Sequence, residues 1–345
     1  MQRIRFGMLG LNFGRHIVDS LTTGPARNVI DLAQVCDRDR DRAHAIGDRL
    51  HLPTAYDLDE LLADDSLEAI GVFTGPAGRA EMIRKIIRAG KHVMTTKPFE
   101  VNSEAALDVL EEANYLGKVV HLNSPSPLMP PNLQQAFKWQ KQYELGRPVA
   151  CRRDVWASYR EKADGTWMDD PKLCPVAPMF RLGIYLVNDM IRLLGEVETV
   201  QVTHSRVFTG RPTADNAQLT LQFRSGSIGS IFASFCVDDN RPYGNAMTLN
   251  YERGTIYQNV NPCSIEQLNE RRMTLVTTAG RKPVLEHVTL DTDSGQYQWD
   301  VFSRAIRGEK LEDAVTPKQV VAGLRVVEAM SRAAESGRTE RVESV

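Results

Sequence analysis

Short apolar runs alternate with amphipathic stretches over roughly the first 120 residues, at the spacing of buried strands and surface helices. The predicted strands lie at residues 4–9, 31–36, 69–73, 91–94 and 118–122. The predicted helices lie at residues 16–21, 43–50, 57–62, 80–89 and 103–116. Strands that alternate with helices in this way are typical of βα units around a parallel sheet.

Small residues mark the ends of two of these helices. Gly90 and Gly117 follow the last apolar positions of their helices, where glycine can adopt the left-handed conformation of a C-cap. Ser103 stands at the start of the second of these helices, and we expect its hydroxyl to cap the free N–H groups there.

The pattern changes after residue 123. A proline-rich segment at 123–131 breaks the alternation of strands and helices. From about residue 197 to 290, apolar and polar positions alternate with a period of two, as at 199–203, 218–223, 230–235 and 247–251. This period predicts antiparallel strands with one buried face and one solvated face. Two helical patterns, at 297–307 and 317–337, follow.

Length and patterning together predict two domains. A chain of 345 residues is longer than one hydrophobic core usually supports. We therefore predict an α/β protein with a first domain of βα units at residues 1–122 and a second domain, with an antiparallel sheet, at residues 123–345.

The composition argues against several classes of partner. A formal net charge of −2 provides no basic field for nucleic acid or an anionic membrane surface. The five cysteines form no CxxC pair and the histidines lack metal-ligand spacing, so neither a disulfide framework nor a metal site is predicted. The chain starts without the apolar core of a secretion signal, and no apolar run reaches the ~18 residues of a membrane span. We therefore expect no membrane association and a cytoplasmic location.

The turn after the first predicted strand is typical of dinucleotide binding. Gly10, Phe13 and Gly14 lie in an imperfect G-x-G-x-x-G turn, in which Asn12 and Arg15 occupy the second and third glycine positions. Glycine permits the tight turn and the approach of a pyrophosphate to the N-terminus of the next helix. Because asparagine tolerates positive φ better than most residues, Asn12 is expected to preserve the turn.

Asp37 makes this motif more specific, because it follows the second predicted strand. A carboxylate there accepts hydrogen bonds from the adenosine ribose and favours NAD. Arg38 is suited to the 2′-phosphate of NADP, so we predict NAD or NADP with a preference for NAD. The alternative is that Asp37 caps a loop in an unrelated α/β protein.

Several segments resemble motifs of the Gfo/Idh/MocA oxidoreductase family. The run at 89–99, AGKHVMTTKPF, is similar to the family's AGKHV followed by E-K-P. The other similar segments lie at 74–76, 167–171, 183–185, 193–197, 305–308, 316–317 and 327–329. Because these segments follow the family's order and spacing over nearly the whole chain, the sequence is identified as a member of this family.

The resemblance implies a Rossmann domain followed by an α/β domain with a large, open and mostly antiparallel sheet. It also implies hydride transfer at a sugar, sugar derivative or cyclitol, and a homodimer or homotetramer that forms through this sheet. Thr74, Gly75 and Pro76 resemble the family's T-P-N turn, which contacts the coenzyme.

Lys97 matches the family lysine that reaches the reacting oxygen and the nicotinamide ribose. It is predicted to lie at the carboxyl end of a strand, where doubly wound sheets bind ligands, and Pro98 stiffens the backbone beside it. Thr96 replaces the usual glutamate, so Lys97 lacks that charge partner. The alternative for Lys97 is a solvated lysine in a loop.

Tyr185 matches the family histidine that acts as general acid and base, and some family members carry tyrosine there. A nearby ammonium group favours the ionised form of a tyrosine hydroxyl, which can then exchange a proton with an alcohol. The alternative is a buried aromatic side chain on the helix at 183–194. Asn188, within one turn of Tyr185, matches a polar position that contacts substrate hydroxyls.

Arg181 is the main departure from the family, which usually has aspartate four residues before the catalytic position. Its guanidinium suits a carboxylate or phosphate on an acidic substrate. The alternative is a structural ion pair with Asp169 or Asp170.

Three further residues complete the predicted site and its surroundings. Asn123 is expected to line the cleft, and Trp167 could provide an aromatic wall for a sugar. Arg79 stands where the family often has histidine, and we assign it to the surface.

The resemblance leaves two other functions open, and the departures at Asn12, Thr96 and Arg181 are the features that keep the second of them open. One is a non-redox enzyme that uses NAD transiently in glycosidase-type elimination. The other is a regulatory protein that binds a dinucleotide without catalysis. Retention of both Lys97 and Tyr185 favours the dehydrogenase.

Overall fold

The computed structural model describes residues 2–260, 264 and 270–344. Contacts between Cα atoms divide the chain into two compact units, which are described separately. Unit 1 comprises residues 1–128 and 297–318, and unit 2 comprises residues 129–296 and 319–345. Cys263, one of the five cysteines, lies outside the described residues.

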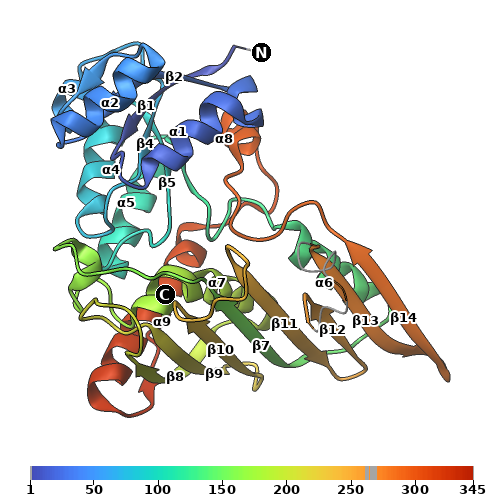
Figure 1. The fold of residues 1–345 in the computed structure, drawn as a ribbon. Helices are drawn as coiled ribbons and strands as arrows, with labels where there is room; N and C mark the ends of the chain where they lie inside the picture. Colours follow the sequence, from blue (N-terminus) through green and yellow to red (C-terminus); the bar gives the residue numbers. More distant parts are fainter. Residues whose placement is uncertain (1, 261–263, 265–269, 345) are drawn as a thin grey trace. The chain divides into compact units, whose positions relative to one another are not determined.

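Unit 1 is built on a six-stranded parallel sheet with the strand order β3-β2-β1-β4-β5-β6 (Figure 1). Its strands are β1 (Ile4–Leu9), β2 (Ile30–Cys36), β3 (Thr54–Ala55), β4 (Ala69–Val72), β5 (His92–Thr95) and β6 (Val120–Leu122). The strand order reverses between β1 and β4. In sheets of this kind, ligands bind beyond the carboxyl ends of the strands at this switch point.

The helices of unit 1 agree with the apolar spacing of the sequence. They are α1 (Gly14–Thr23), α2 (Arg40–Leu50), α3 (Leu58–Leu62), α4 (Arg79–Arg88), α5 (Ser103–Tyr115) and α8 (Trp299–Ile306), with a short 3-10 turn at Pro25–Asn28. Asn102, and not Ser103, caps α5, because its side-chain oxygen accepts a hydrogen bond from Ala105 N at 2.8 Å. The predicted cap, Ser103, therefore lies one residue after the observed cap.

Residues 297–318 belong to unit 1 because apolar side chains of α8 pack into its core. Trp299 and Phe302 of α8 belong to the buried cluster that includes Phe6 of β1. The Phe6 and Trp299 rings meet edge to face with their centroids 5.6 Å apart. The sequence pattern assigns this stretch to the second domain because only its long-range packing links it to the first.

Unit 2 contains a nine-stranded sheet with the order β14-β13-β12-β11-β7-β10-β9-β8-β15. Its strands are β7 (Pro148–Trp156), β8 (Val197–Ser205), β9 (Asn216–Phe223), β10 (Ile228–Ser234), β11 (Gly244–Tyr251), β12 (Gly254–Gln258), β13 (Arg272–Ala279), β14 (Lys282–Thr289) and β15 (Glu340–Arg341). The pairing of β7 with β10 is parallel, and the other pairs are antiparallel. The predicted α/β fold with a mostly antiparallel second sheet is therefore confirmed.

Helical elements flank and connect the strands of unit 2. They are α6 (Pro131–Gln142), a 3-10 turn at Trp167–Asp169, a π-helical turn at Met179–Gly183, α7 (Ile184–Leu194) and α9 (Pro317–Ser336), whose first two residues belong to unit 1. Gly229 of β10 lets α7 approach closely, because a Cβ atom there would lie 2.2 Å from Met190 Cε. The sequence pattern missed α6, since Pro131 lies at its first position, where proline is tolerated.

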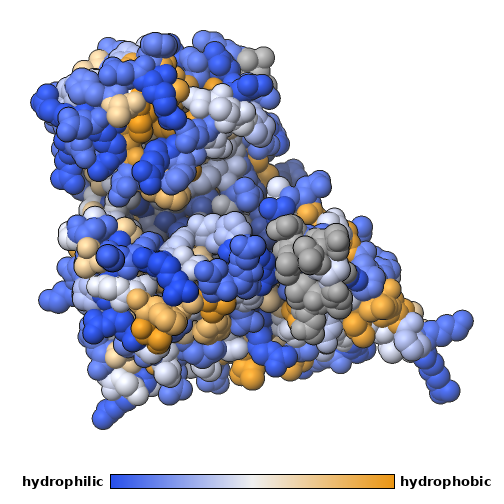
Figure 2. All heavy atoms as spheres, in the orientation of Figure 1, coloured by the Kyte–Doolittle hydropathy of each residue, from blue (hydrophilic) through white to orange (hydrophobic). Residues whose placement is uncertain are grey.

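The surface agrees with the composition of the chain. Figure 2 shows a mostly hydrophilic face on which apolar residues form separate patches. Within residues 2–260, 264 and 270–344, we find no helix with both the length and the apolar character of a membrane span.

A buried ion pair fastens α7 to the sheet of unit 2. Arg153 Nη1 of β7 lies 3.0 Å from Asp189 Oδ2 of α7, and both side chains are at most 6% exposed. Removal of one partner of such a pair leaves an uncompensated buried charge, which costs about 3–5 kcal/mol.

We therefore expect Asp189→Ala to lower the free energy of unfolding by about 3–5 kcal/mol, as measured by urea denaturation followed by circular dichroism. Glu196→Ala is the matched control, because Glu196 forms an exposed ion pair with Arg224, and such pairs contribute about 0–1 kcal/mol. Equal losses in the two variants would contradict a special role for the buried pair.

Candidate active site

The turn between β1 and α1 is held by a close approach of two backbones. Gly10 has a φ of 88°, and a Cβ atom at Gly10 would lie 3.0 Å from Phe73 C and from Thr74 N. Only glycine fits here without strain. Asn12 is exposed and lies outside the left-handed region, so the expectation that it takes positive φ was wrong: Gly10 supplies this conformation instead.

The start of α1 is suited to an anionic group. Phe13 occupies the N-cap position without a side-chain hydrogen bond to the helix, and the first turn of α1 has no acidic residue. The N–H groups of a first helical turn have no partner within the helix and favour negative charge. Together with the tight turn at Gly10, this arrangement fits the pyrophosphate of a dinucleotide.

Asp37, at the end of β2, is tied to the same turn. Its Oδ2 accepts a hydrogen bond from Leu11 N at 2.7 Å, and its Oδ1 accepts one from Asp39 N at 2.9 Å. Arg42 Nη1 lies 3.2 Å from Asp37 Oδ2, while Arg38 is exposed. Asp37 therefore holds the turn in place, in addition to the role in ribose binding that the sequence predicts.

Arg79 is fully buried, so its assignment to the surface was wrong. Its guanidinium donates hydrogen bonds to Thr96 O at 2.7 Å and to Phe99 O at 3.2 Å, and also to Thr74 O and Pro98 O. Arg79 thereby connects the turn after β4, which contains the predicted coenzyme residues at 74–76, with the segment after β5.

Lys97 follows β5, and its peptide bond to Pro98 is cis. Lys97 N donates to Asn123 Oδ1 at 3.1 Å, and Thr96 Oγ1 donates to the same oxygen at 3.3 Å. Tyr297 OH donates to Thr96 Oγ1 at 2.8 Å. Thr96, which stands where the family has glutamate, therefore takes part in a neutral network with Asn123 and Tyr297 that fixes the backbone of Lys97.

Tyr185 lies in the first turn of α7 and is half-buried. A Cβ atom at Gly295, whose φ is 95°, would lie 3.0 Å from Tyr185 Cε1, so this glycine packs against the ring. The preceding residue, Ser294, donates to Asp189 Oδ2 at 2.7 Å and to Asn132 Oδ1 at 3.1 Å. These bonds hold the segment that borders the Tyr185 ring.

Arg181 forms an ion pair with Glu161, and neither Asp169 nor Asp170 is the partner in this contact. Arg181 Nη1 and Nη2 donate to the two carboxylate oxygens of Glu161 at 2.6 and 2.8 Å. Its guanidinium also lies 4.7 Å from the centroid of the Phe235 ring. Because Arg181 lies in the π-helical turn, the four-residue spacing to Tyr185 differs from that of a regular α-helix.

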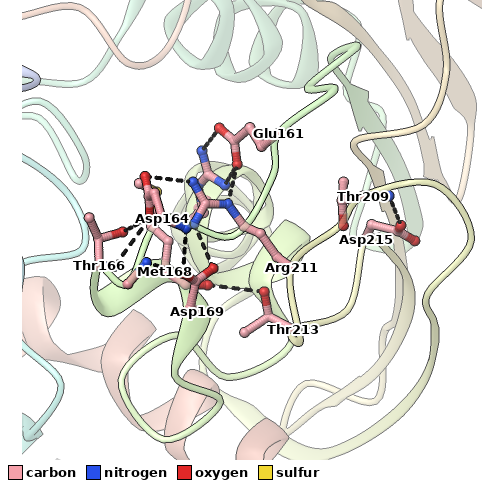
Figure 3. A network of polar contacts seen from close by, with 11 residues as sticks. Glu161, Asp164, Thr166, Met168, Asp169, Thr209, Arg211, Thr213 and Asp215 are labelled. Carbon is pink, nitrogen blue, oxygen red and sulfur yellow. Dashed lines mark hydrogen bonds and ion pairs between the residues drawn. The ribbon is translucent and has the colours of Figure 1, made fainter.

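Arg211 binds the same carboxylate and two more (Figure 3). Arg211 donates to Glu161 Oε2 at 2.9 Å, Asp164 Oδ1 at 2.9 Å and Asp169 Oδ1 at 2.7 Å. Burial opposes ionisation of Glu161, but the hydrogen bonds from Arg181 and Arg211 keep the pKa of its carboxyl below the usual value. Arg181 and Arg211 thus share Glu161, which remains a carboxylate.

The other two predicted substrate residues of unit 2 take part in packing. Asn188 is 5% exposed, and a Cβ atom at Gly323 of α9 would lie 2.0 Å from Asn188 Oδ1. Trp167 is half-buried, and its ring meets the Phe180 ring edge to face at 6.2 Å. Asn188 and Trp167 therefore have a structural role, and their contacts with substrate stay a prediction.

The geometry of unit 1 is that of a Rossmann domain with a turn that suits a dinucleotide. The family of oxidoreductases with an NAD-binding Rossmann fold matches residues 4–124, and the GFO/IDH/MocA C-terminal domain matches residues 133–257. The chain belongs to the Gfo/Idh/MocA family, as the sequence motifs indicated, and it is an NAD(P)-dependent oxidoreductase.

Curated relatives are similar over different shares of the chain. D-xylose 1-dehydrogenase (NADP+) 2 of Haloferax volcanii is 26% identical over 317 residues, which cover 89% of this chain and 90% of the relative. The scyllo-inositol 2-dehydrogenase (NADP+) of Bacillus subtilis is 24% identical over 234 residues, or 64% of this chain and 60% of the relative.

Solved structures share the fold over the whole chain. The WlbA dehydrogenase of Bordetella pertussis, in complex with NADH and UDP-GlcNAcA, has a TM-score of 0.76 at 16% identity, with 100% of both chains covered. Levoglucosan dehydrogenase, in complex with NADH and levoglucosan, has a TM-score of 0.76 at 14% identity, with 99% of this chain and 100% of that chain covered.

The contacts at Gly10 and Gly14 predict opposite responses to the same substitution. At Gly10, a methyl group would meet backbone atoms at 3.0 Å and the residue would keep an unfavourable φ. At Gly14, the nearest atom to a Cβ would be Phe73 Cβ at 3.5 Å, which is an ordinary contact.

We expect Gly10→Ala to destabilise the protein by about 1–3 kcal/mol. Gly14→Ala should be neutral or stabilising by up to about 1 kcal/mol, because alanine favours a helix. Chemical denaturation of both variants measures the difference. A Gly14→Ala variant that is as unstable as Gly10→Ala would contradict this account of the turn.

Proposed function

We propose that the protein transfers a hydride between the nicotinamide of NAD(P) and a CH–OH carbon of an uncharged sugar or cyclitol. The placement of Lys97 carries the proposal, because its backbone is fixed at the carboxyl end of β5, next to β4, and the segment after β4 meets the Gly10 turn. The relatives named as dehydrogenases of D-xylose and scyllo-inositol support this class of substrate.

NAD(P), when bound, supplies the acceptor or donor of the hydride. In the oxidising direction, Tyr185 receives the proton of the substrate hydroxyl, and the Lys97 ammonium stabilises the negative charge that develops on the oxygen. In the reducing direction, Tyr185 returns the proton.

The partners of Arg181 favour an uncharged substrate over an acidic one. Both Nη atoms of Arg181 bind Glu161, and a substrate carboxylate would have to replace this bidentate contact. We therefore propose that Arg181 is structural and that the substrate presents hydroxyl groups.

The outer face of the unit 2 sheet is the proposed interface of a homodimer or homotetramer. Val276 of β13 pairs directly with Leu285 of β14, and Ile228 of β10 has the same outward orientation as these two residues. Their exposed fractions of 44–63% are high for large apolar side chains. Three buried free thiols, at Cys36, Cys151 and Cys174, support the proposed location in the reducing cytoplasm.

Substitution of the two proposed catalytic residues tests the reaction. We expect Lys97→Ala and Tyr185→Phe each to lower kcat by about 10²–10⁴-fold, because each removes a group that acts on the reacting oxygen. NAD(P)H formation is measured by absorbance with a panel of aldoses, inositols, sugar acids and glycosides. Lys172→Ala and Tyr115→Phe are matched controls at exposed positions.

Full turnover by Lys97→Ala would reject the proposed chemistry. If the wild-type protein binds NAD(H) tightly and converts glycosides without net NADH formation, the non-redox enzyme is correct. If it binds NAD(H) and converts nothing on the panel, the regulatory alternative is favoured. A preference for sugar acids would restore Arg181 as an anion-binding residue.

We further propose that NAD is the preferred coenzyme, because the Asp37 carboxylate at the end of β2 disfavours a second phosphate nearby. Asp37→Ser keeps an oxygen for Leu11 N but removes the charge. We expect the ratio of kcat/KM for NADP+ to that for NAD+ to rise by about tenfold or more, which corresponds to about 1.4 kcal/mol. Asp41→Ser is the matched control, and a wild-type preference for NADP+ would contradict the proposal.

A further inference from the structure

Arg79 binds backbone carbonyl groups that lie beyond the paired parts of β4 and β5. The pairing of β4 with β5 ends at Val72 and Thr95, so the chain segments beyond these residues have no ladder hydrogen bonds between them. Buried carbonyl groups in such segments need other partners. The Arg79 guanidinium supplies them, because it donates to Thr74 O on one segment and to Thr96 O, Pro98 O and Phe99 O on the other.

Glu100 links the same two regions, because its carboxylate accepts hydrogen bonds from backbone N–H groups. Its side chain is 2% exposed and accepts hydrogen bonds from Ala80 N at 2.8 Å, Gly78 N at 3.3 Å and Val101 N at 2.8 Å. Arg79 therefore connects the start of α4 to the segment after β5, and Glu100 connects that segment back to the start of α4. Burial lowers the pKa of Arg79 to about 10, which the negative charge of Glu100 partly offsets.

The chemistry of the contact requires arginine. Arg79 Nη1 donates to the three carbonyl oxygens after β5, and Nη2 donates to Thr74 O, so the contact uses two nitrogen atoms that a planar guanidinium holds at a fixed separation. A lysine ammonium carries three donors on one atom, and a histidine ring carries at most two. We expect neither to replace all the contacts at once.

We propose that Arg79, together with Glu100, is a positioning residue that fixes Lys97 and the turn at 74–76 in the arrangement that coenzyme binding and hydride transfer require. Two of the carbonyls that Arg79 binds, Thr96 O and Pro98 O, lie on either side of Lys97. This inference rests on the proposed function, because it assigns to Arg79 an effect that acts through Lys97.

The first test uses Arg79→Lys, which keeps the charge but loses the forked contact. We expect NAD(P)H, titrated by its fluorescence, to bind about tenfold or more weakly, and kcat to fall about 10- to 100-fold. Arg84→Lys is the matched control, because Arg84 lies on the same helix and forms its ion pairs with Glu81 and Glu112 away from the loops. Circular dichroism and the unfolding midpoint show whether each variant is folded.

The second test asks whether Arg79 acts through Lys97. If it does, the double variant Arg79→Lys/Lys97→Ala should have the same kcat as Lys97→Ala alone, because residues that act as one unit are not additive. Multiplicative losses in kcat would overturn the proposal, as would wild-type coenzyme binding by folded Arg79→Lys. If Arg79→Lys does not fold, Glu100→Gln replaces it in both tests, with an expected three- to tenfold weaker binding of coenzyme.

The outcomes separate this inference from the function on which it rests. If the wild-type protein binds neither NADH nor NADPH, the proposed function fails. If the wild-type protein binds coenzyme and needs Lys97 for turnover, but Arg79→Lys behaves like the wild type, only the positioning role of Arg79 fails.

Discussion

The structure of the candidate site depends on what holds the chain together where the parallel ladder stops. Strands β4, β5 and β6 pair up to Val72, Thr95 and Leu122. Just beyond these positions lie three parts of the proposed site, namely the turn at 74–76, Lys97 and Asn123. A parallel sheet places these ends side by side but offers them no further backbone partners. Side chains provide the missing hydrogen bonds, and they determine how rigidly the site is held.

Two kinds of side chain provide these bonds. Between β4 and β5, the charged fork of Arg79 binds four neutral carbonyls and depends on Glu100 to offset its charge. Between β5 and β6, the neutral groups of Asn123, Thr96 and Tyr297 form a hydrogen-bonded chain that reaches Lys97 N. The neutral chain fixes the backbone of Lys97 without adding a charge of its own, which suits the proposed action of the Lys97 ammonium on an oxygen with developing negative charge.

Local patterns made the sheet of unit 1 and its glycine turn predictable. Gly10 could be recognised because a glycine between a buried strand and a helix is typical of the tight turn that approaches a dinucleotide. The burial of Arg79 could not be predicted, because an arginine at the start of an amphipathic helix usually lies in solvent. The four carbonyls that it binds belong to residues 5–20 positions away in the sequence. The sequence also did not predict that Tyr297 and α8 belong to unit 1, because this assignment rests on contacts with Thr96 and Phe6, which are far away in the sequence.

The charges of unit 2 show why a single departure from a family motif is a poor guide to specificity. Arg181 in place of aspartate predicts a positive pocket when it is considered alone. In the structure its partner Glu161 is 20 residues away in the sequence, and Arg211 is bound to Asp164 and Asp169 more than 40 residues away. These ion pairs join two guanidinium groups to three carboxylates, which gives one net negative charge. Arg181 is therefore already bound in a cluster that carries no excess positive charge, so its replacement of aspartate does not by itself create an anion-binding pocket.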